Sequence, residues 1–447
     1  MSAMEGLEVS TDLTTHSLLL AATNHDVRAL RDLLRNGSAN VQDEDTGYTP
    51  LHAAVAAFDV APEDAPSDAQ ESANTGTNKP QPSQEALDAA AATIKLLMAN
   101  GAIWNDLDKN NETPGCIAAR LGLGELYELF VDAGVRAELL LSRLDEYQIL
   151  GDDGESSDEE EGEEVEGGAT AEEGDVEVVV EDGFEMVRDE SGGEAVQAAN
   201  GSSEDLSASG VVVEKKVEGT GEPANPDVKS AEYLESELTF DGDRLLDADK
   251  NGVMMAWETS IMQRSADLLL PEEGLRVLNV GHGMGIIDRI IQEKRPAEHH
   301  IIEAHPAVVK RMKEEGWTEK KGVVVHEGRW QDVVEGLVAQ NVTFDAIYFD
   351  TFAEEYKALR EFFSEYVIGL LDSEGRFGFF NGLGADRKVC YDVYTKIVEM
   401  ELFEAGFDTE WEEIPIPDLD ANGEWEGVRR KYWVLDTYRL PTCKFIG

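Results

Sequence analysis

Between residues 231 and 447, short apolar runs typical of strands alternate with segments whose apolar residues recur every three or four positions. The runs predicted as strands are LRVLNV (275–280), EHHIIEA (298–304), KGVVVHEG (321–328), FDAIYFD (344–350) and GRFGFFNG (375–382). The helical patterns between them cover 286–294, 307–316, 331–340 and 357–371. Strands that alternate with helices predict an α/β domain with a parallel, doubly wound sheet. A ligand is then expected at the carboxyl ends of the central strands.

Residues 1–150 show a different pattern, with short helical segments separated by turn signals. Leu18 and Leu51 are 33 residues apart, which matches the ankyrin period, and residues 49–52 read Thr-Pro-Leu-His, the signature of that repeat. A weaker copy begins with Thr-Pro at 113–114, about 30 residues later than the period requires. The excess is explained if the stretch near 59–86, rich in Pro, Ser, Ala and acid, is a disordered insertion.

We therefore interpret residues 1–150 as ankyrin-like repeats that end in a helix pair within 126–144. So few repeats cannot cover their apolar faces alone, and we expect them to pack on another domain. The sequence leaves two roles open, a protein-binding surface and a structural appendage. Between the two regions we predict a disordered linker, residues 151–230, because its first part, GDDGESSDEEEGEEVEGGATAEEGD (151–175), is almost entirely acid, Gly and Ser. The VEVVV and FEMV segments of this linker are able to pair locally.

The net charge of −56 changes the range of partners. An acidic surface repels nucleic acid and anionic membrane, so basic proteins or cationic substrates are expected instead. Three widely spaced cysteines argue against a disulfide framework and fit a reducing compartment. No signal peptide is recognised, and no apolar run is long enough to span a bilayer. The histidines form no clear set of metal ligands, so we expect no metal.

The first predicted strand leads into the turn Gly-His-Gly-Met-Gly-Ile at 281–286. A nicotinamide-binding turn has Gly-x-Gly-x-x-Gly, but here the third glycine comes one residue early, at Gly285. Gly-x-Gly-x-Gly is common in class I S-adenosylmethionine methyltransferases. In either turn, glycine lets the backbone approach the ligand without a Cβ in the way.

The following strands end in polar residues that suit this cofactor. Glu303 ends the second strand, where a carboxylate accepts bonds from ribose hydroxyls. Arg329 and Trp330 follow the third strand and are candidates for an adenine contact. Asp350 ends the fourth strand, close to the expected position of the transferred methyl group.

A second group of candidates precedes the sheet, in NGVMMAWETSIMQRSADLLL at 251–270. The spacing of Met254, Trp257, Met262 and Leu269 predicts an amphipathic helix with a Met/Trp core stripe. Glu258 is the exception, because a carboxylate in an apolar setting is costly unless it is paired. A guanidinium would pair it well.

The segments VMMAWETSIM, VLNVGHGMGIIDRIIQ, HHIIEAHPAVVKRM, HEGRWQDV and FDAIYFDTF resemble guanidinoacetate methyltransferase. With the ankyrin-like N-terminal region, the whole chain resembles the fungal arginine delta-N-methyltransferases, or type IV protein arginine methyltransferases. The resemblance is strong over 231–447 and looser over 10–150. One departure is FFNGLGADRK at 379–388, where the guanidinoacetate enzymes carry a different, polar segment that helps set the substrate.

The resemblance implies a class I methyltransferase fold over 231–447 with S-adenosylmethionine as cofactor. It assigns the catalytic roles to Glu258, which binds the guanidino group, and Asp350, which touches both cofactor and substrate. It assigns cofactor contacts to Phe240, Met262, Gly281, His282, Gly283, Met284, Gly285, Ile286, Glu303, Ala304, His305, Arg329, Trp330 and Asp350.

The expected reaction is methylation of the delta nitrogen (N5) of arginine in a protein substrate, basic or ribosomal as in the family. Two alternatives remain open: a small-molecule guanidino methyltransferase, and an ankyrin scaffold whose methyltransferase fold is inactive. We expect a monomer in the cytoplasm and nucleus that binds neither nucleic acid nor membrane directly.

Overall fold

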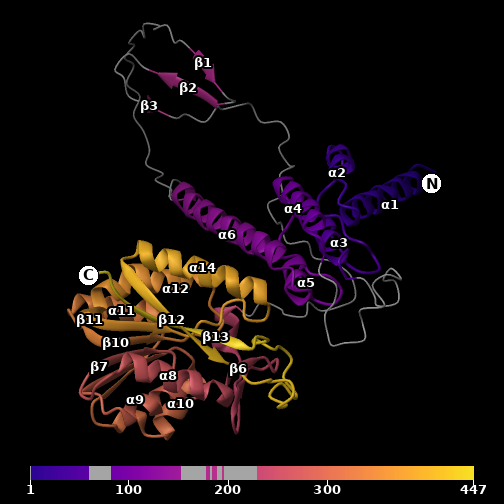
Figure 1. Ribbon diagram of the computed structural model, residues 1–447. Coiled ribbons are helices and arrows are strands. Elements are labelled where there is room, and N and C mark those ends of the chain that lie inside the picture. The colour runs from indigo at the N-terminus through magenta and orange to yellow at the C-terminus, as the bar shows by residue number, and fades with distance from the viewer. Residues whose placement is uncertain (1, 60–81, 153–177, 182–183, 189–193, 196–228) are drawn as a thin grey trace, which may run out of the picture. The chain divides into compact units, whose positions relative to one another are not determined.

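A computed structural model of the chain is shown in Figure 1. It describes the backbone of residues 2–59, 82–152, 178–181, 184–188, 194–195 and 229–447, and the side chains of 13–59, 82–143 and 229–447. The expected insertion near 59–86 and the expected linker at 151–230 lie for the most part outside the described residues. Met1–Arg143 and Thr220–Gly447 form one compact unit, and Leu144–Gly219 form a second.

A seven-stranded sheet forms the centre of the C-terminal region. Its strand order is β12 (Phe407–Pro415), β13 (Thr437–Phe445), β11 (Leu371–Phe379), β10 (Phe344–Phe349), β7 (Arg276–Val280), β8 (Glu298–Glu303) and β9 (Val323–Glu327). The five predicted strands are all present and pair in parallel. The expectation of a wholly parallel sheet is wrong, because β13 runs antiparallel to both β11 and β12. The fold is a class I methyltransferase fold with a mixed sheet.

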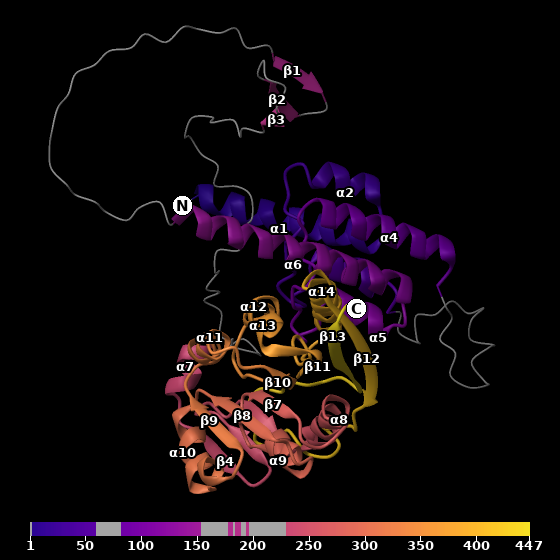
Figure 2. The ribbon, with the colours of Figure 1, turned by 90° about the vertical axis from the view of Figure 1, so that its left-hand side faces the viewer.

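Helices cover both faces of this sheet (Figure 2). One face carries α8 (Thr259–Leu269), α9 (Ile286–Glu293) and α10 (Pro306–Glu314), and the other carries α11 (Trp330–Ala339), α12 (Tyr356–Glu361) and α14 (Lys388–Glu404). The pattern at 357–371 forms α12, a π-helical turn (Phe362–Val367) and α13 (Ile368–Leu370). Alternate strand residues enter opposite cores: Leu278 and Val280 face α11, whereas Val277 faces α9.

The segment before the sheet differs from the prediction. After α7 (Ser230–Glu235), an antiparallel sheet of β4 (Thr239–Asp241), β5 (Arg244–Leu246) and β6 (Gly252–Met255) forms. The helix predicted over 251–270 begins only at Thr259, because residues 252–255 pair with β5 instead. A 3-10 turn at Ala256–Glu258 joins β6 to α8.

Six helices make up the described N-terminal region: α1 (Ser2–Thr23), α2 (Val27–Leu33), α3 (Pro50–Ala56), α4 (Gln84–Ala99), α5 (Pro114–Arg120) and α6 (Gly124–Asp152). Thr49 caps α3 and Thr113 caps α5, each accepting a backbone N–H, and each is followed by proline at the first helical position. The helix pair predicted within 126–144 is wrong. The segment lies in a single helix, α6, which continues through Gly134 without a break.

The N-terminal helices and α14 share one hydrophobic core within the compact unit. Val389, Cys390, Val393 and Ile397 of α14 are buried in the same cluster as residues of α1 to α6. A Cβ on Gly134 would lie 2.6 Å from Val393, so the close approach of α6 to α14 requires glycine there. This contact agrees with the expectation that the N-terminal helices lean on another domain.

The second unit contains described residues only in part. The antiparallel strands β1 (Val178–Glu181) and β2 (Phe184–Arg188) pair, and the short β3 (Glu194–Ala195) pairs with β2. Residues 178–180 of the VEVVV segment therefore do pair with the FEMV segment. Among the described residues, no helix combines the length and the apolar character needed to cross a membrane.

Candidate active site

The glycine turn at 281–286 joins the end of β7 to α9. Gly281, Gly283 and Gly285 have φ angles of 95°, 53° and 70°, which side chains rarely adopt. A Cβ on Gly281 would lie 1.8 Å from the carbonyl oxygen of Asp350. The turn therefore packs directly against the end of β10, which brings the two predicted strand-end features together. α9 begins at Ile286, one residue after the last of these glycines.

A buried network of polar side chains holds the glycine turn in place. The Nδ1 of His282 lies 2.6 Å from Asp288, whose other oxygen lies 3.0 Å from Nε2 of His299 and accepts from Asn279 at 2.9 Å. Burial by itself would raise the pKa of Asp288, but His282 and His299 hold it below its usual value. The His282 side chain is thus committed to the protein, and its backbone is the part available to a cofactor.

Glu303 ties the end of β8 to the turn. Its Oε2 accepts from the backbone nitrogens of His282 at 2.9 Å and Gly283 at 3.2 Å, and its Oε1 accepts from that of His305 at 2.7 Å. The His305 ring in turn caps α10 and lies 3.0 Å from the carbonyl of Tyr233. This carboxylate is held rigidly at the place where the sequence predicts the ribose contact.

Four other residues assigned to the cofactor have different surroundings. The Met284 nitrogen lies 3.2 Å from the sulfur of Met254. Met262 is fully buried in the same apolar cluster as Met254. Phe240, on β4, is half-buried, with the Arg311 guanidinium 4.2 Å from its ring centre. Ala304 lines a surface hollow between α10 and the end of β9.

The structure places Arg329 and Trp330 in contrasting environments. Arg329 is exposed and precedes the first residue of α11. Trp330 is only 3% exposed, and its indole packs edge-on against Phe349 and other core rings. Its Nε1 donates to both oxygens of Glu354, at 3.1 and 3.0 Å. Most of the indole therefore belongs to the core, and its polar edge is the part nearest the strand ends.

Glu258 and Asp350 are the two acids at the centre of the site. Glu258 is buried, and burial together with the negative charge of Asp350 raises its pKa to about 8. Burial, and then the charge of Asp288, raises the pKa of Asp350 to about 7. The Oδ2 of Asp350 is buried and has no hydrogen-bond partner among the described residues. Such an atom is costly unless a ligand or water pairs it, so this position fits a cationic substrate.

Sequence reasoning missed a group of aromatic side chains beside Glu258. Tyr432 donates its hydroxyl to Oε1 of Glu258, and its ring stacks on Trp257 with centres 6.0 Å apart. Trp433 lies 5.8 Å from Trp257 on another side. The sequence does contain an aromatic pair at 432–433, but nothing in it reveals contact with a residue 174 positions earlier.

These features fit S-adenosylmethionine. The turn offers backbone that no Cβ obstructs, Glu303 is fixed beside it, and the unpaired Oδ2 of Asp350 lies at the end of the adjacent strand. In the part of the chain that the structure describes, no group of three His, Cys, Asp or Glu side chains is placed to hold a metal ion.

Comparison with known proteins agrees with this geometry. The guanidinoacetate N-methyltransferase family model matches residues 222–424. Protein arginine N-methyltransferase 2 of Aspergillus fumigatus is 56% identical over 97% of this chain and 97% of its own length. The proteins of that name from Emericella nidulans and Gibberella zeae are 53% and 44% identical, over 98% and 94% of this chain and 98% and 90% of their own lengths. The chain belongs to the protein arginine N-methyltransferase 2 family.

Membership of this family makes the chain an arginine methyltransferase. A solved S-adenosylmethionine-dependent methyltransferase from Mesorhizobium loti is 14% identical, with a TM-score of 0.31 over 42% of this chain and 98% of that one. That likeness is too low to add to what the strand order already shows.

Proposed function

We propose that this protein arginine N-methyltransferase 2 family member methylates the delta nitrogen of arginine in a protein substrate. The observation that carries the proposal is the pair of acids Glu258 and Asp350, which lie close enough for the charge of one to raise the pKa of the other. An arginine guanidinium is a planar cationic fork that two carboxylates bind well. The names of the relatives support arginine as the substrate.

The acids have distinct tasks in the proposed mechanism. Guanidinium has a pKa above about 12, so a nitrogen becomes nucleophilic only as a proton is removed. Asp350, at the carboxyl end of β10, accepts that proton, because a pKa raised to about 7 makes it a better base than an ordinary aspartate. Glu258, in the 3-10 turn between β6 and α8, binds the same guanidinium. Bound S-adenosylmethionine would supply the methyl group, whose carbon is electrophilic because it is bonded to a sulfonium sulfur; the new nitrogen–carbon bond would form as the carbon–sulfur bond breaks, and the neutral thioether would leave.

Positioning contributes most of the acceleration in this proposal. The glycine turn packs against Asp350, and Glu303 bonds to the same turn, so cofactor and base are held on connected backbone. Methylation of the internal nitrogen requires the outer nitrogens to be gripped while the inner one faces the sulfonium. We assign cofactor contacts to Phe240, Met262, Gly281, His282, Gly283, Met284, Gly285, Ile286, Glu303, Ala304, His305, Arg329, Trp330 and Asp350.

We further propose that α1 to α6 are ankyrin-type repeats. Thr49 forms a capping box with His52, and the His52 ring lies 3.1 Å from the carbonyl of Glu112, just before the next Thr-Pro turn. This contact between successive helix pairs supports the assignment, as does the 33-residue spacing. We retain the acidic linker at 151–230 as a proposal from composition.

The partner is proposed to be a basic protein, ribosomal in the first instance, because a net charge of −56 favours cationic partners and disfavours nucleic acid. The chain is proposed to act as a monomer in the cytoplasm and nucleus. Its described cysteines are all free, which fits a reducing compartment.

One experiment separates this function from its rivals. The chain is incubated with labelled S-adenosylmethionine, basic ribosomal protein and free guanidinoacetate, and the modified arginine is fragmented by mass spectrometry. Label on the delta nitrogen of a protein arginine supports the proposal. Label on free guanidinoacetate alone would favour the small-molecule enzyme, which the match to the guanidinoacetate family model keeps open. Absence of cofactor binding by calorimetry would leave only a scaffold.

A further inference from the structure

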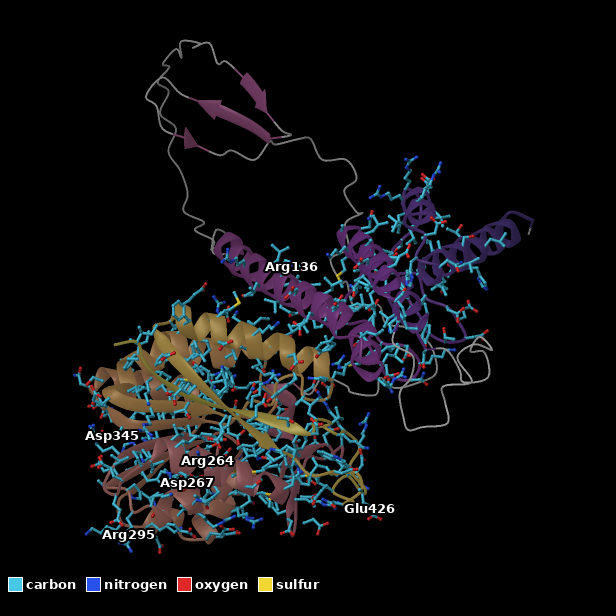
Figure 3. The ribbon with its side chains drawn as sticks, in the orientation of Figure 1. Arg136, Arg264, Asp267, Arg295, Asp345 and Glu426 are labelled. Carbon is cyan, nitrogen blue, oxygen red and sulfur yellow. The ribbon has the colours of Figure 1, made fainter. Side chains whose placement is uncertain are left out.

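The connection between β12 and β13, residues 416–436, carries Tyr432, whose hydroxyl contacts Glu258. It is fastened to the small N-terminal sheet of the catalytic region. Arg244 of β5 donates to the backbone carbonyl of Glu426 at 2.6 Å, and the Arg429 nitrogen donates to that of Lys250 at 2.9 Å. Glu426 is labelled in Figure 3 at the edge of this region. The connection is therefore held against the elements that precede Glu258.

Tyr432 is the residue of this connection that touches Glu258. Its hydroxyl donates to Oε1, the same oxygen that accepts from the Met255 nitrogen at 3.1 Å. The ring is fixed on three sides. It stacks on Trp257, meets the edge of Trp425 with centres 5.1 Å apart, and lies where a Cβ on Gly252 would come within 2.8 Å of it.

Two donors fill Oε1, since a carboxylate oxygen has two lone pairs. Within the part of the chain that the structure describes, Glu258 accepts these bonds through Oε1, and its other oxygen, Oε2, is left for a ligand. We propose that Tyr432 is a positioning residue of the methyl-transfer reaction: by occupying Oε1 it fixes the Glu258 carboxylate and leaves Oε2 to grip the arginine guanidinium. This inference rests on the proposed function, in which Glu258 binds that guanidinium.

Neighbouring groups also change the pKa of Glu258. Asp350 raises the pKa of Glu258, as burial does, whereas the Tyr432 hydroxyl and the Met255 nitrogen act to lower it. Two other titratable side chains, Tyr348 and Tyr438, lie near enough to interact electrostatically with Glu258. Burial raises the pKa of both well above the usual value, so they carry no charge. Tyr432 is thus the only side chain among these that favours the ionised Glu258 required for binding a cation.

The test is Tyr432→Phe, which removes the hydroxyl and keeps the ring. We expect kcat/KM for an arginine peptide to fall about tenfold, mainly through a higher KM, because a bond to a charged group is lost. We also expect the acidic limb of the kcat/KM–pH profile to move to higher pH, because the pKa of Glu258 rises without the donor. A merely structural role would lower activity without moving that limb.

Tyr394→Phe is the matched control. The Tyr394 hydroxyl also donates to a carboxylate, that of Glu138 at 3.2 Å, but in the contact between α14 and α6. We expect its kcat/KM and its pH profile to equal those of the wild type. Equal shifts in both variants would show a general effect of losing a tyrosine hydroxyl and would overturn the proposal.

Glu258→Gln separates the inference from the function beneath it. If Glu258→Gln loses activity while Tyr432→Phe keeps wild-type constants and profile, the role of Tyr432 is wrong and the proposed function stands. If Glu258→Gln remains fully active, the role of Glu258 itself is wrong. Should Tyr432→Phe fail to bind cofactor in calorimetry, 3-fluorotyrosine at position 432 takes its place. This stronger donor should move the acidic limb to lower pH, and an unmoved limb would overturn the proposal.

Discussion

The N-terminal helices and the catalytic region each contain a buried carboxylate, Asp108 and Asp350, and the two are paired very differently. In the helical region, Thr49 and His52 satisfy each other and the neighbouring backbone, and Asp108 accepts from Asn110 and Glu112 of its own loop. In the catalytic region, Asp350 keeps an unpaired oxygen. The comparison teaches that a buried carboxylate fixes a loop when its oxygens are bonded, as at Asp108, and keeps unfavourable electrostatics for a ligand when one oxygen is unpaired, as at Asp350.

We expect the largest effect from a substitution that removes the negative charge of Asp350. Asp350→Asn keeps the shape of the side chain but cannot accept a proton, so we expect kcat to fall by about 10²-fold or more. The melting temperature and cofactor affinity should change little. Steady-state kinetics and calorimetry check both, and wild-type turnover in this variant would remove Asp350 from the mechanism.

The same electrostatics predict a pH dependence. With pKa values raised to about 8 for Glu258 and about 7 for Asp350, the acids of the free enzyme lose their charge as pH falls through this range. We therefore expect kcat/KM to drop about tenfold or more between pH 8 and pH 6, with the pair titrating together. A profile that is flat across this range would contradict the burial of both acids.

The core shared by the two regions is tested next. Val393 is fully buried between α14 and the N-terminal helices, and Val393→Asp would place a charge there. We expect the free energy of unfolding to fall by about 3 kcal/mol or more, measured in denaturant. Met400→Asp is the control, because Met400 lies on the same helix but is 46% exposed, and its stability should hardly change.

We expect the smallest effect, on stability, from removing a hydrogen-bonded polar group of the N-terminal helices. Thr49→Ala removes the cap of α3 and should lower the free energy of unfolding by about 1 kcal/mol, with kcat unchanged. The exposed Thr318→Ala, in the catalytic region, serves as the comparison. If Thr49→Ala instead reduces kcat at full stability, the N-terminal helices take part in the reaction.

Much of the site could be predicted from the sequence because strands β7, β8 and β10 each end in a chemically distinctive residue or turn. The glycine turn and Glu303 are joined by hydrogen bonds, and Gly281 packs on the backbone of Asp350, as the parallel order of these strands requires. The convergence follows from strand direction alone, so it needs no knowledge of side-chain packing.

Pairing between distant or irregular segments was harder to predict. The antiparallel β12 and β13 were not expected, although acidic residues alternate with Phe407, Thr409 and Trp411 along β12. The helical spacing of Met254 and Trp257 also misplaced the start of α8, since pairing of residues 252–255 with β5 overrides it.

Side-chain environment was the hardest problem. An aromatic residue after a strand is compatible with a ligand contact or with a core, and tertiary packing decided that most of the Trp330 indole lies in the core. Tyr432 lies in an irregular connection with no periodic pattern, so only the folded chain brings it to Glu258. Gly134 gave no signal that α6 is continuous, because one glycine inside a helix is tolerated.

Cys390 gives the shared core one more property. It is 3% exposed, and burial raises the pKa of its thiol to about 12, so it reacts with alkylating reagents only when the packing around the start of α14 opens. The rate of its modification therefore reports how often this part of the shared core opens, and a substrate that slows the reaction reveals that binding tightens it.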